Sequence, residues 1–189
     1  GCIGADTGGT LLGVTVQEDG LRWLSVGDSP LYLYRGRRLR QLNEVHSMAA
    51  QLDLMVREGA LEAEAARSHP QRHCLTSALT GQQVPRIDCP GRAVALAPGD
   101  LIVLASDGLN VLGQRDLGRV IRASAPAGSA AVIRALLQAV AERDAPQQDN
   151  VSLIVIRIDT REPSAAPRPQ GGLARRMAGA LAARARRLR

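Results

Sequence analysis

The sequence predicts an α+β fold in which antiparallel strands pack with helices. Residues 10–42 hold short runs of β-branched and bulky apolar residues separated by turn sequences. Residues 128–143 repeat apolar side chains at helical spacing, and residues 101–106 are continuously apolar. Strands joined by short turns pair antiparallel, and a helix with one apolar stripe packs that stripe against a core. These three observations together predict the fold class.

The first segment is expected to form an antiparallel meander of about four strands. Asp19-Gly20 lies between two of the apolar runs, which is a strong hairpin signal because glycine accepts a positive φ. A second turn is expected at 27–30 and a third at Gly36. The strands are expected at residues 10–16, 21–26, 31–35 and 37–42.

The rest of the chain alternates helical and extended patterns. Helical propensity is high over residues 48–68, with an interruption at Gly59 and a stop before Pro70. The apolar run at 101–106 predicts a strand that is buried on both faces. The other expected elements are a loop with a short helix or turn at 69–81, a strand at 92–97, helices at 114–123 and 128–143, and a strong strand at 151–158.

Residues 1–159 are expected to be the domain, and residues 160–189 a tail. Residues 160–172 are rich in Pro, Gly, Ala and Ser, which is typical of a linker, and the sequence after them can form a basic helix. From Thr160 onward eight arginines accompany one glutamate, a charge of +7, so the remaining residues carry −1 of the total +6. Three interpretations of this Arg-rich tail stay open: a solvated end, contact with an anionic membrane or nucleic acid, or docking to a partner.

The cysteines and the hydropathy indicate a cytoplasmic location. Cys2, Cys74 and Cys89 are odd in number and widely spaced, which argues against a disulfide framework and for unpaired thiols in a reducing compartment. No apolar run reaches the roughly 18 residues that a membrane span needs. All 24 basic residues are arginine, which we interpret as the codon bias of a GC-rich, bacterial genome.

Two aspartates stand at the ends of the most apolar strands. Asp107 directly follows the run at 101–106, and Asp149 directly precedes the run at 151–158. If the two strands are neighbours, both carboxylates meet at one rim, where hard cations such as Mg²⁺ or Mn²⁺ find oxygen ligands. Asp28, in the turn after another strand, can join them. On spacing alone, ordinary turn or cap roles for these aspartates stay open.

A series of short motifs along residues 1–158 resembles the protein phosphatase 2C (PPM-type) family. The resemblance implies the fold of that family, an antiparallel β-sandwich flanked by helices, in an α-β-β-α order. The matching segments are Gly8-Gly9-Thr10-Leu11, Gly27-Asp28-Ser29, His46-Ser47, Pro98-Gly99-Asp100-Leu101, Ser106-Asp107-Gly108 and Gln148-Asp149-Asn150.

The resemblance also implies an activity and a set of ligands. The family hydrolyses phosphoserine and phosphothreonine in proteins with two or three Mn²⁺ or Mg²⁺ ions, and its substrates come from serine/threonine kinases. Asp107 and Asp149 would ligate one metal, and Asp28 with Asp107 would hold a third, weaker one. Asn150 and Gly108 would support the site. The mobile flap of the family corresponds to about residues 46–75.

One part of the family pattern is not found in these 189 residues. The Asp-Gly-x-Gly-Gly motif, whose Asp bridges two metals, and the phosphate-binding Arg belong to the family's opening third. We therefore expect the catalytic residues in a preceding N-terminal segment, and little turnover by this chain alone. Asp6-Thr7-Gly8-Gly9 is a poor substitute. The alternative is a non-catalytic phosphatase-like module that binds phosphoproteins or other partners.

Three histidines and two arginines complete the candidates. His46, His69 and His73 are expected at the surface in loops, since Pro70 prevents His69 and His73 from sharing a helix face. Arg72 and Arg86 could contact a substrate phosphate, although arginine is abundant throughout the chain.

Overall fold

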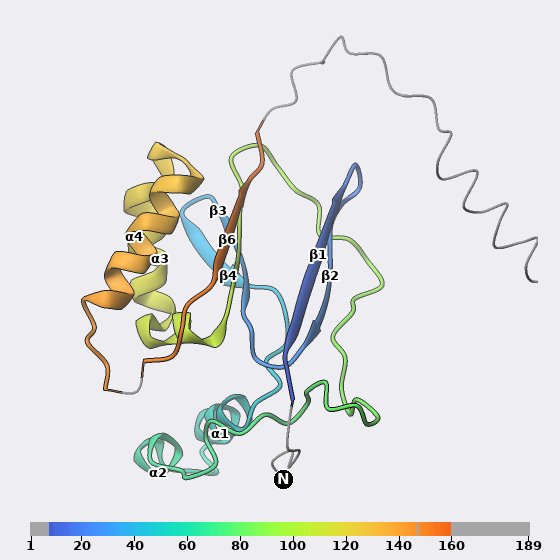
Figure 1. The fold of residues 1–189 in the computed structure, drawn as a ribbon, viewed down its shortest axis with the longest axis vertical. Helices are drawn as coiled ribbons and strands as arrows, with labels where there is room; N and C mark the ends of the chain where they lie inside the picture. The colour runs from blue at the N-terminus through green and yellow to red at the C-terminus, as the bar shows by residue number, and fades with distance from the viewer. Residues whose placement is uncertain (1–7, 147, 160–189) are drawn as a thin grey trace, which may run out of the picture.

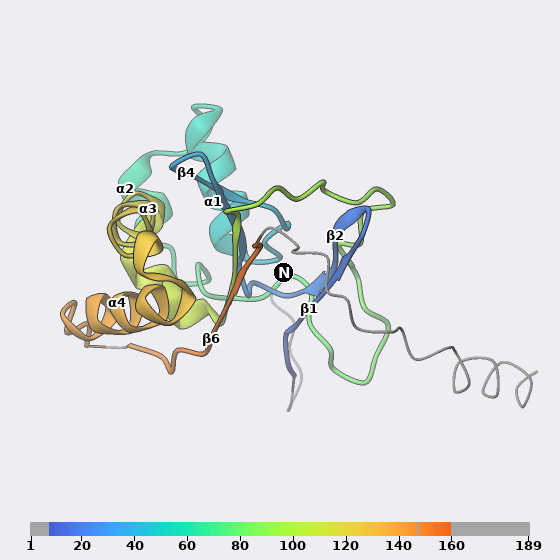
Figure 2. The ribbon, with the colours of Figure 1, turned by 90° about the horizontal axis from the view of Figure 1, so that it is seen from above.

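The computed structural model describes residues 8–146 and 148–159. These residues form three layers, which Figure 1 shows side by side: helices α3 and α4, a four-stranded antiparallel sheet, and a two-stranded sheet. Figure 2 shows the same order from above. Helices α1 and α2 lie at one end of the layers. The predicted α+β fold with two antiparallel sheets is confirmed.

The two-stranded sheet is the hairpin predicted around Asp19-Gly20. β1 (Leu11–Gln17) pairs antiparallel with β2 (Gly20–Val26), and the partners Gln17 and Gly20 close the turn. Gly20 has a φ of 127°, and a Cβ on it would lie 2.3 Å from the carbonyl oxygen of Val94. Glycine at this position therefore serves both the turn and the loop packed against it.

The predicted single meander over residues 10–42 is wrong in one respect. β3 (Leu31–Arg35) and β4 (Arg38–Gln41) pair with each other, but β2 and β3 lie in different sheets. Leu21 and Trp23 of β2 belong to the same buried cluster as Leu31 and Leu33 of β3. Stacking the two sheets buries apolar faces that in-plane pairing of these strands would leave in water.

β5 (Leu101–Ala105) is the central strand and is buried along its whole length, as predicted. The larger sheet has the order β4-β3-β5-β6, all antiparallel, with β6 at Leu153–Arg157. Alternate side chains of β5 serve two cores. Leu101 and Val103 pack in the cluster that includes α3 and α4, whereas Ile102 and Leu104 pack toward β1 and β2.

The helices lie close to their predicted places. α3 (Gly113–Ser124) and α4 (Ser129–Ala141) cover the outer face of the larger sheet with Leu117, Ile121 and Leu136. The helical segment at 48–68 divides near Gly59, as expected, into α1 (Met48–Arg57) and α2 (Ala63–Arg67). Two short 3₁₀ helices complete the list, η1 (Asp107–Leu112) and η2 (Ala125–Ala127).

Three expectations for the loops need correction. Residues 92–97 form no strand, and Val94 makes only an isolated bridge to Leu21, because turn sequences with proline lie on both sides of this segment. Cys89 has a free thiol, as expected, and is exposed, but Cys74 is disulfide-bonded. His46 is fully buried instead of exposed. None of the described helices is long and apolar enough to cross a membrane. The predicted linker and Arg-rich tail at 160–189 lie outside the described residues.

Candidate functional site

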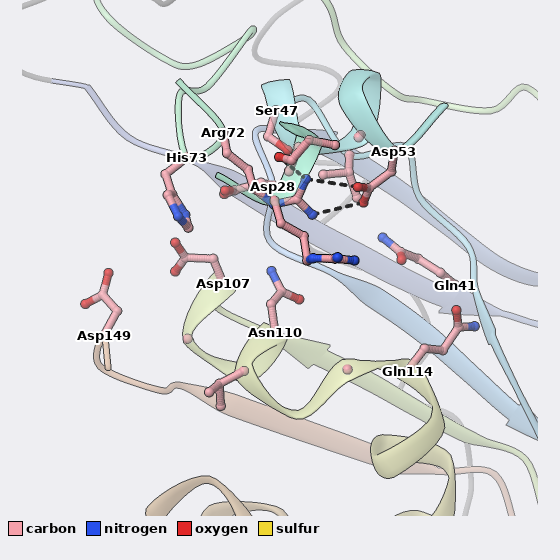
Figure 3. A pocket seen from close by; sticks show the side chains of 18 of the residues that line it. Asp28, Gln41, Ser47, Asp53, Arg72, His73, Asp107, Asn110, Gln114 and Asp149 are labelled. Carbon is pink, nitrogen blue, oxygen red and sulfur yellow. Dashed lines mark hydrogen bonds and ion pairs between the residues drawn. The ribbon is translucent and has the colours of Figure 1, made fainter. Parts of the chain in front are cut away.

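An open cleft of about 1280 Å³ lies where β5 ends, between the α1–α2 segment and η1. Asp28, Asp107 and Asp149 all line it, although they come from three separate loops. In Figure 3 the carboxylates of Asp107 and Asp149 and the ring of His73 point toward one open space. The structure therefore brings together the three aspartates that the sequence singled out.

Asp107 is positioned by the end of β5 and by the loop that leads into β6. It is the first residue of η1 and its side chain is exposed. Ser106 clamps the two loops together: its N–H donates to the carbonyl of Ser152 at 3.0 Å, and its Oγ accepts from the N–H of Ser152 at 3.0 Å. The same Oγ donates to the carbonyl of Asn150 at 3.0 Å. A short, well-bonded junction thus fixes the backbone beside Asp107.

Gly108 lets the Asp149 loop approach Asp107 closely. A Cβ on Gly108 would lie 2.6 Å from the carbonyl oxygen of Asn150 and 2.9 Å from that of Asp149, both shorter than real Cβ contacts. The side-chain amide of Gln148 donates to the carbonyl of Gly108 at 3.0 Å and ties the loops again. A side chain at this position would not allow the backbone contact. That contact favours the predicted supporting role of Gly108, which stays a prediction.

Asn150 contributes through its backbone. Its N–H donates to Oδ1 of Asp149 at 2.7 Å, and its carbonyl accepts from Ser106. Within the described residues its side chain makes no hydrogen bond. The supporting role predicted for Asn150 stays a prediction.

Asp28 faces Asp107 from the turn after β2. Burial, followed by the negative charge of Asp107, raises the pKa of Asp28 to about 6. His46 holds this turn through two hydrogen bonds to Gly27. The ring Nδ1 of His46 accepts from the N–H of Gly27 at 3.2 Å, and the backbone N–H of His46 donates to the carbonyl of Gly27 at 2.9 Å. Two carboxylates that disfavour each other's charge are therefore fixed in one cleft.

The donor set suits a hard divalent cation, because carboxylate oxygens are the ligands of Mg²⁺ and Mn²⁺. A cation between Asp28 and Asp107 would remove the repulsion that their positions create. Within residues 8–146 and 148–159, no cluster of three or more His, Cys, Asp or Glu side chains is arranged to hold a metal. The ligand roles of Asp28, Asp107 and Asp149 accordingly stay predictions.

Of the basic residues on the other wall of the cleft, only Arg72 was named from the sequence as a possible phosphate contact. Helices α1 and α2 contribute Arg57 and Arg67, and the loop after them contributes Arg72 and His73. Arg72 binds Asp53 through two hydrogen bonds, of 2.9 and 3.2 Å. His73 is exposed, as expected, but it lines the cleft. Which arginines line the cleft depends on how α1 and α2 pack against the rest of the protein.

Comparison with known proteins gives a consistent answer, although no protein-family model matches the sequence. Protein phosphatase PhpP of Streptococcus pneumoniae is 30% identical over 120 residues, which are 63% of this chain and 47% of that protein. The PPM Ser-Thr phosphatase MsPP from Mycobacterium smegmatis, solved with cacodylate, is 31% identical with a TM-score of 0.57, over 79% of this chain and 62% of that one.

The chain is similar in sequence and in fold to bacterial PPM-type serine/threonine phosphatases. It spans about half the length of the curated PPM relatives that it matches. The catalytic domain of the serine/threonine protein phosphatase PstP, solved with two manganese ions, shares the fold with a TM-score of 0.58 at 20% identity, over 80% of this chain and 60% of that domain.

Proposed function

We propose that this chain is part of a metal-dependent phosphatase that hydrolyses phosphoserine and phosphothreonine in proteins. The observation that carries the proposal is the meeting of Asp28, Asp107 and Asp149 in one cleft, in a chain similar to named protein phosphatases. Asp107 and Asp149 would hold one Mn²⁺ or Mg²⁺, and Asp28 with Asp107 a weaker one. The two manganese ions in the PstP structure support this choice of metals.

The metals, when bound, would supply an activated water and neutralise charge on the phosphoryl oxygens. The part of this chain is to hold them. Asp107 and Asp149 provide anionic oxygen ligands at a rim that Ser106 and Gly108 fix, so little reorganisation is needed on binding. Asp28 adds a second carboxylate beside Asp107. The remaining ligands would come from a segment carrying the Asp-Gly-x-Gly-Gly motif.

The proposal extends to organisation and partners. Residues 1–159 would belong to the phosphatase domain and residues 160–189 would be a linker and Arg-rich tail. The partners would be proteins phosphorylated by a serine/threonine kinase in the cytoplasm.

The test uses the full-length protein that contains this chain, a phosphothreonine peptide, and Mn²⁺ or Mg²⁺. Asp149→Asn should lower kcat/KM by about a hundredfold or more, because several kcal/mol of metal-derived stabilisation would be lost. Asp144→Asn is the matched control in the same loop, since Asp144 has a φ of 45° that asparagine adopts readily. Unchanged hydrolysis by Asp149→Asn would remove Asp149 from the site, and hydrolysis that survives a chelator would refute metal dependence.

A further inference from the structure

The α1–α2 wall of the cleft differs in charge from the rim that carries the aspartates. Among the residues of this wall and of the loop after it, three arginines and His73 line the cleft beside one acidic residue, Asp53. Across from them, the part of η1 after Asp107 and the start of α3 contribute uncharged groups, including Asn110 and Gln114. One cleft therefore has an acidic end and a basic wall.

The three arginines are bound to different degrees. Arg72 is the anchored one, with a side chain 22% exposed and both ends of its guanidinium on Asp53. Arg67 pairs with Glu64 at 2.6 Å, but both side chains are well exposed, so this pair contributes little and can exchange. Arg57 is exposed, and the described part of the chain gives it no acidic partner. Arg57 and Arg67 are thus available to bind an anion.

The cleft is large enough to admit part of a polypeptide. Its volume of about 1280 Å³ exceeds the roughly 300–1,000 Å³ typical of small-molecule pockets. Small side chains on the α1–α2 wall leave room along it: Ala49, Ala50, Ala63 and Ala66. Arg57 and Arg67 line the same cleft as Asp107 and Asp149, so a peptide whose phosphorylated residue lies at the two aspartates has both arginines in the space beside it.

We propose that Arg57 and Arg67 select substrates with acidic residues next to the phosphorylated serine or threonine. The inference rests on the proposed function and adds the substrate class. Guanidinium groups form charge-assisted hydrogen bonds with carboxylates, and opposite charges along a cleft set partner choice and association rate more than raw affinity.

The experiment measures kcat/KM of the full-length protein on three substrates. Two are phosphothreonine peptides that differ only in Glu or Gln at the flanking positions, with the flank tested before and after the phosphothreonine. The third is p-nitrophenyl phosphate, which has no flanking chain. The wild type should prefer Glu on at least one side by about three- to tenfold at low salt, and the preference should shrink as salt screens it.

Two variants complete the design. Arg57→Gln combined with Arg67→Gln should abolish the preference for Glu and leave hydrolysis of p-nitrophenyl phosphate unchanged, which also reports that the variant is folded. Arg134→Gln, on the exposed side of α4 outside the cleft, should retain the preference. Equal rates on Glu and Gln peptides, or a preference that survives the double variant, would overturn the inference while the phosphatase proposal stands. Absence of hydrolysis of every substrate would overturn the phosphatase proposal and this inference with it.

Discussion

The two ends of β5 each carry an aspartate, and the two carboxylates are in opposite situations. Asp100 precedes the strand, is 2% exposed, and accepts hydrogen bonds from Arg35 at 2.8 and 2.5 Å and from the N–H of Ala97 at 2.8 Å. Asp107 follows the strand, is exposed, and within the described residues its carboxylate accepts no hydrogen bond. The protein itself satisfies the carboxylate of Asp100, whereas the carboxylate of Asp107 has no hydrogen-bond partner among the described residues.

The pKa shifts express the same difference. Burial alone raises the pKa of Asp100, but the hydrogen bonds from Arg35 and Ala97 and the charge of Arg35 outweigh it, so the pKa falls below its usual value of 3.8. At the other end, burial and the charge of Asp107 raise the pKa of Asp28. A carboxylate at the rim of a sheet is therefore not sufficient to indicate a site; an unpaired one facing a second carboxylate is the informative case.

The largest expected effect is at Asp107. Asp107→Asn should lower metal-dependent hydrolysis of a phosphothreonine peptide by about a thousandfold, because a metal ligand and its charge are lost. The urea midpoint of the metal-free protein should stay the same or rise, because the repulsion with Asp28 is removed. A hydrolysis rate near that of the wild type would show that Asp107, like Asp100, is not a metal ligand.

Gly108→Ala tests whether activity requires the close packing of the Asp149 loop against Gly108. The new Cβ would meet two backbone carbonyls at 2.6 and 2.9 Å, so the Asp149 loop must move. A displacement of this kind can cost about a hundredfold in rate without removing any ligand. Gly118→Ala is the control, since its Cβ would lie 3.7 Å from Leu39 and alanine favours a helix. Full activity of Gly108→Ala would show that the loops have more freedom than this packing implies.

Asp100→Asn should separate stability from activity. We expect a loss of about 1–2 kcal/mol in the free energy of unfolding, a value reduced because the Arg35 side chain is 45% exposed. Hydrolysis at low temperature should stay near that of the wild type.

The pH dependence follows from the lowered pKa of Asp100. A depressed pKa contributes stability above the unfolded value of about 3.9 and loses it as the pH falls through the folded value. Urea midpoints should therefore differ fully between wild type and Asp100→Asn at pH 7, and converge only below about pH 4. Asp19→Asn, which removes an exposed pair with Arg22, should move the midpoint little. A constant gap down to pH 3 would exclude the charge of Asp100 as the cause.

The contrast between Asp100 and Asp107 marks how far sequence reasoning reaches. Both aspartates adjoin the same apolar run, so position alone predicts that each is at a rim but not which one is paired. Arg35 binds Asp100 across 65 residues of sequence, and no local pattern announces that partner. The burial of His46 has the same origin: its short loop reads as exposed, but its backbone joins Gly27 to Thr76.

Elements were predicted better than their partners. The spacing of apolar residues and the turn residues predict the ends of β5, α3 and α4 to within a few positions, because these signals are local in sequence. Stacking instead of pairing of β2 and β3 depends on which faces meet, and that information is spread over both strands. For the same reason Arg57 and Arg67 could not be predicted, because the local sequence does not distinguish an arginine that lines the cleft from any other exposed helical arginine.

The smallest expected effect is at Asp28, and it sharpens the contrast within the site. Asp28→Ala should weaken Mn²⁺ binding by about tenfold or less. The more weakly bound ion would lose one ligand, while Asp107 and Asp149 would still hold the other ion. Calorimetric titration of the full-length protein with Mn²⁺ measures this, and Asp28→Asn separates loss of charge from loss of shape. A loss as large as that of Asp107→Asn would make Asp28 a principal ligand. Unchanged titration curves would instead show that Asp28 is not a metal ligand.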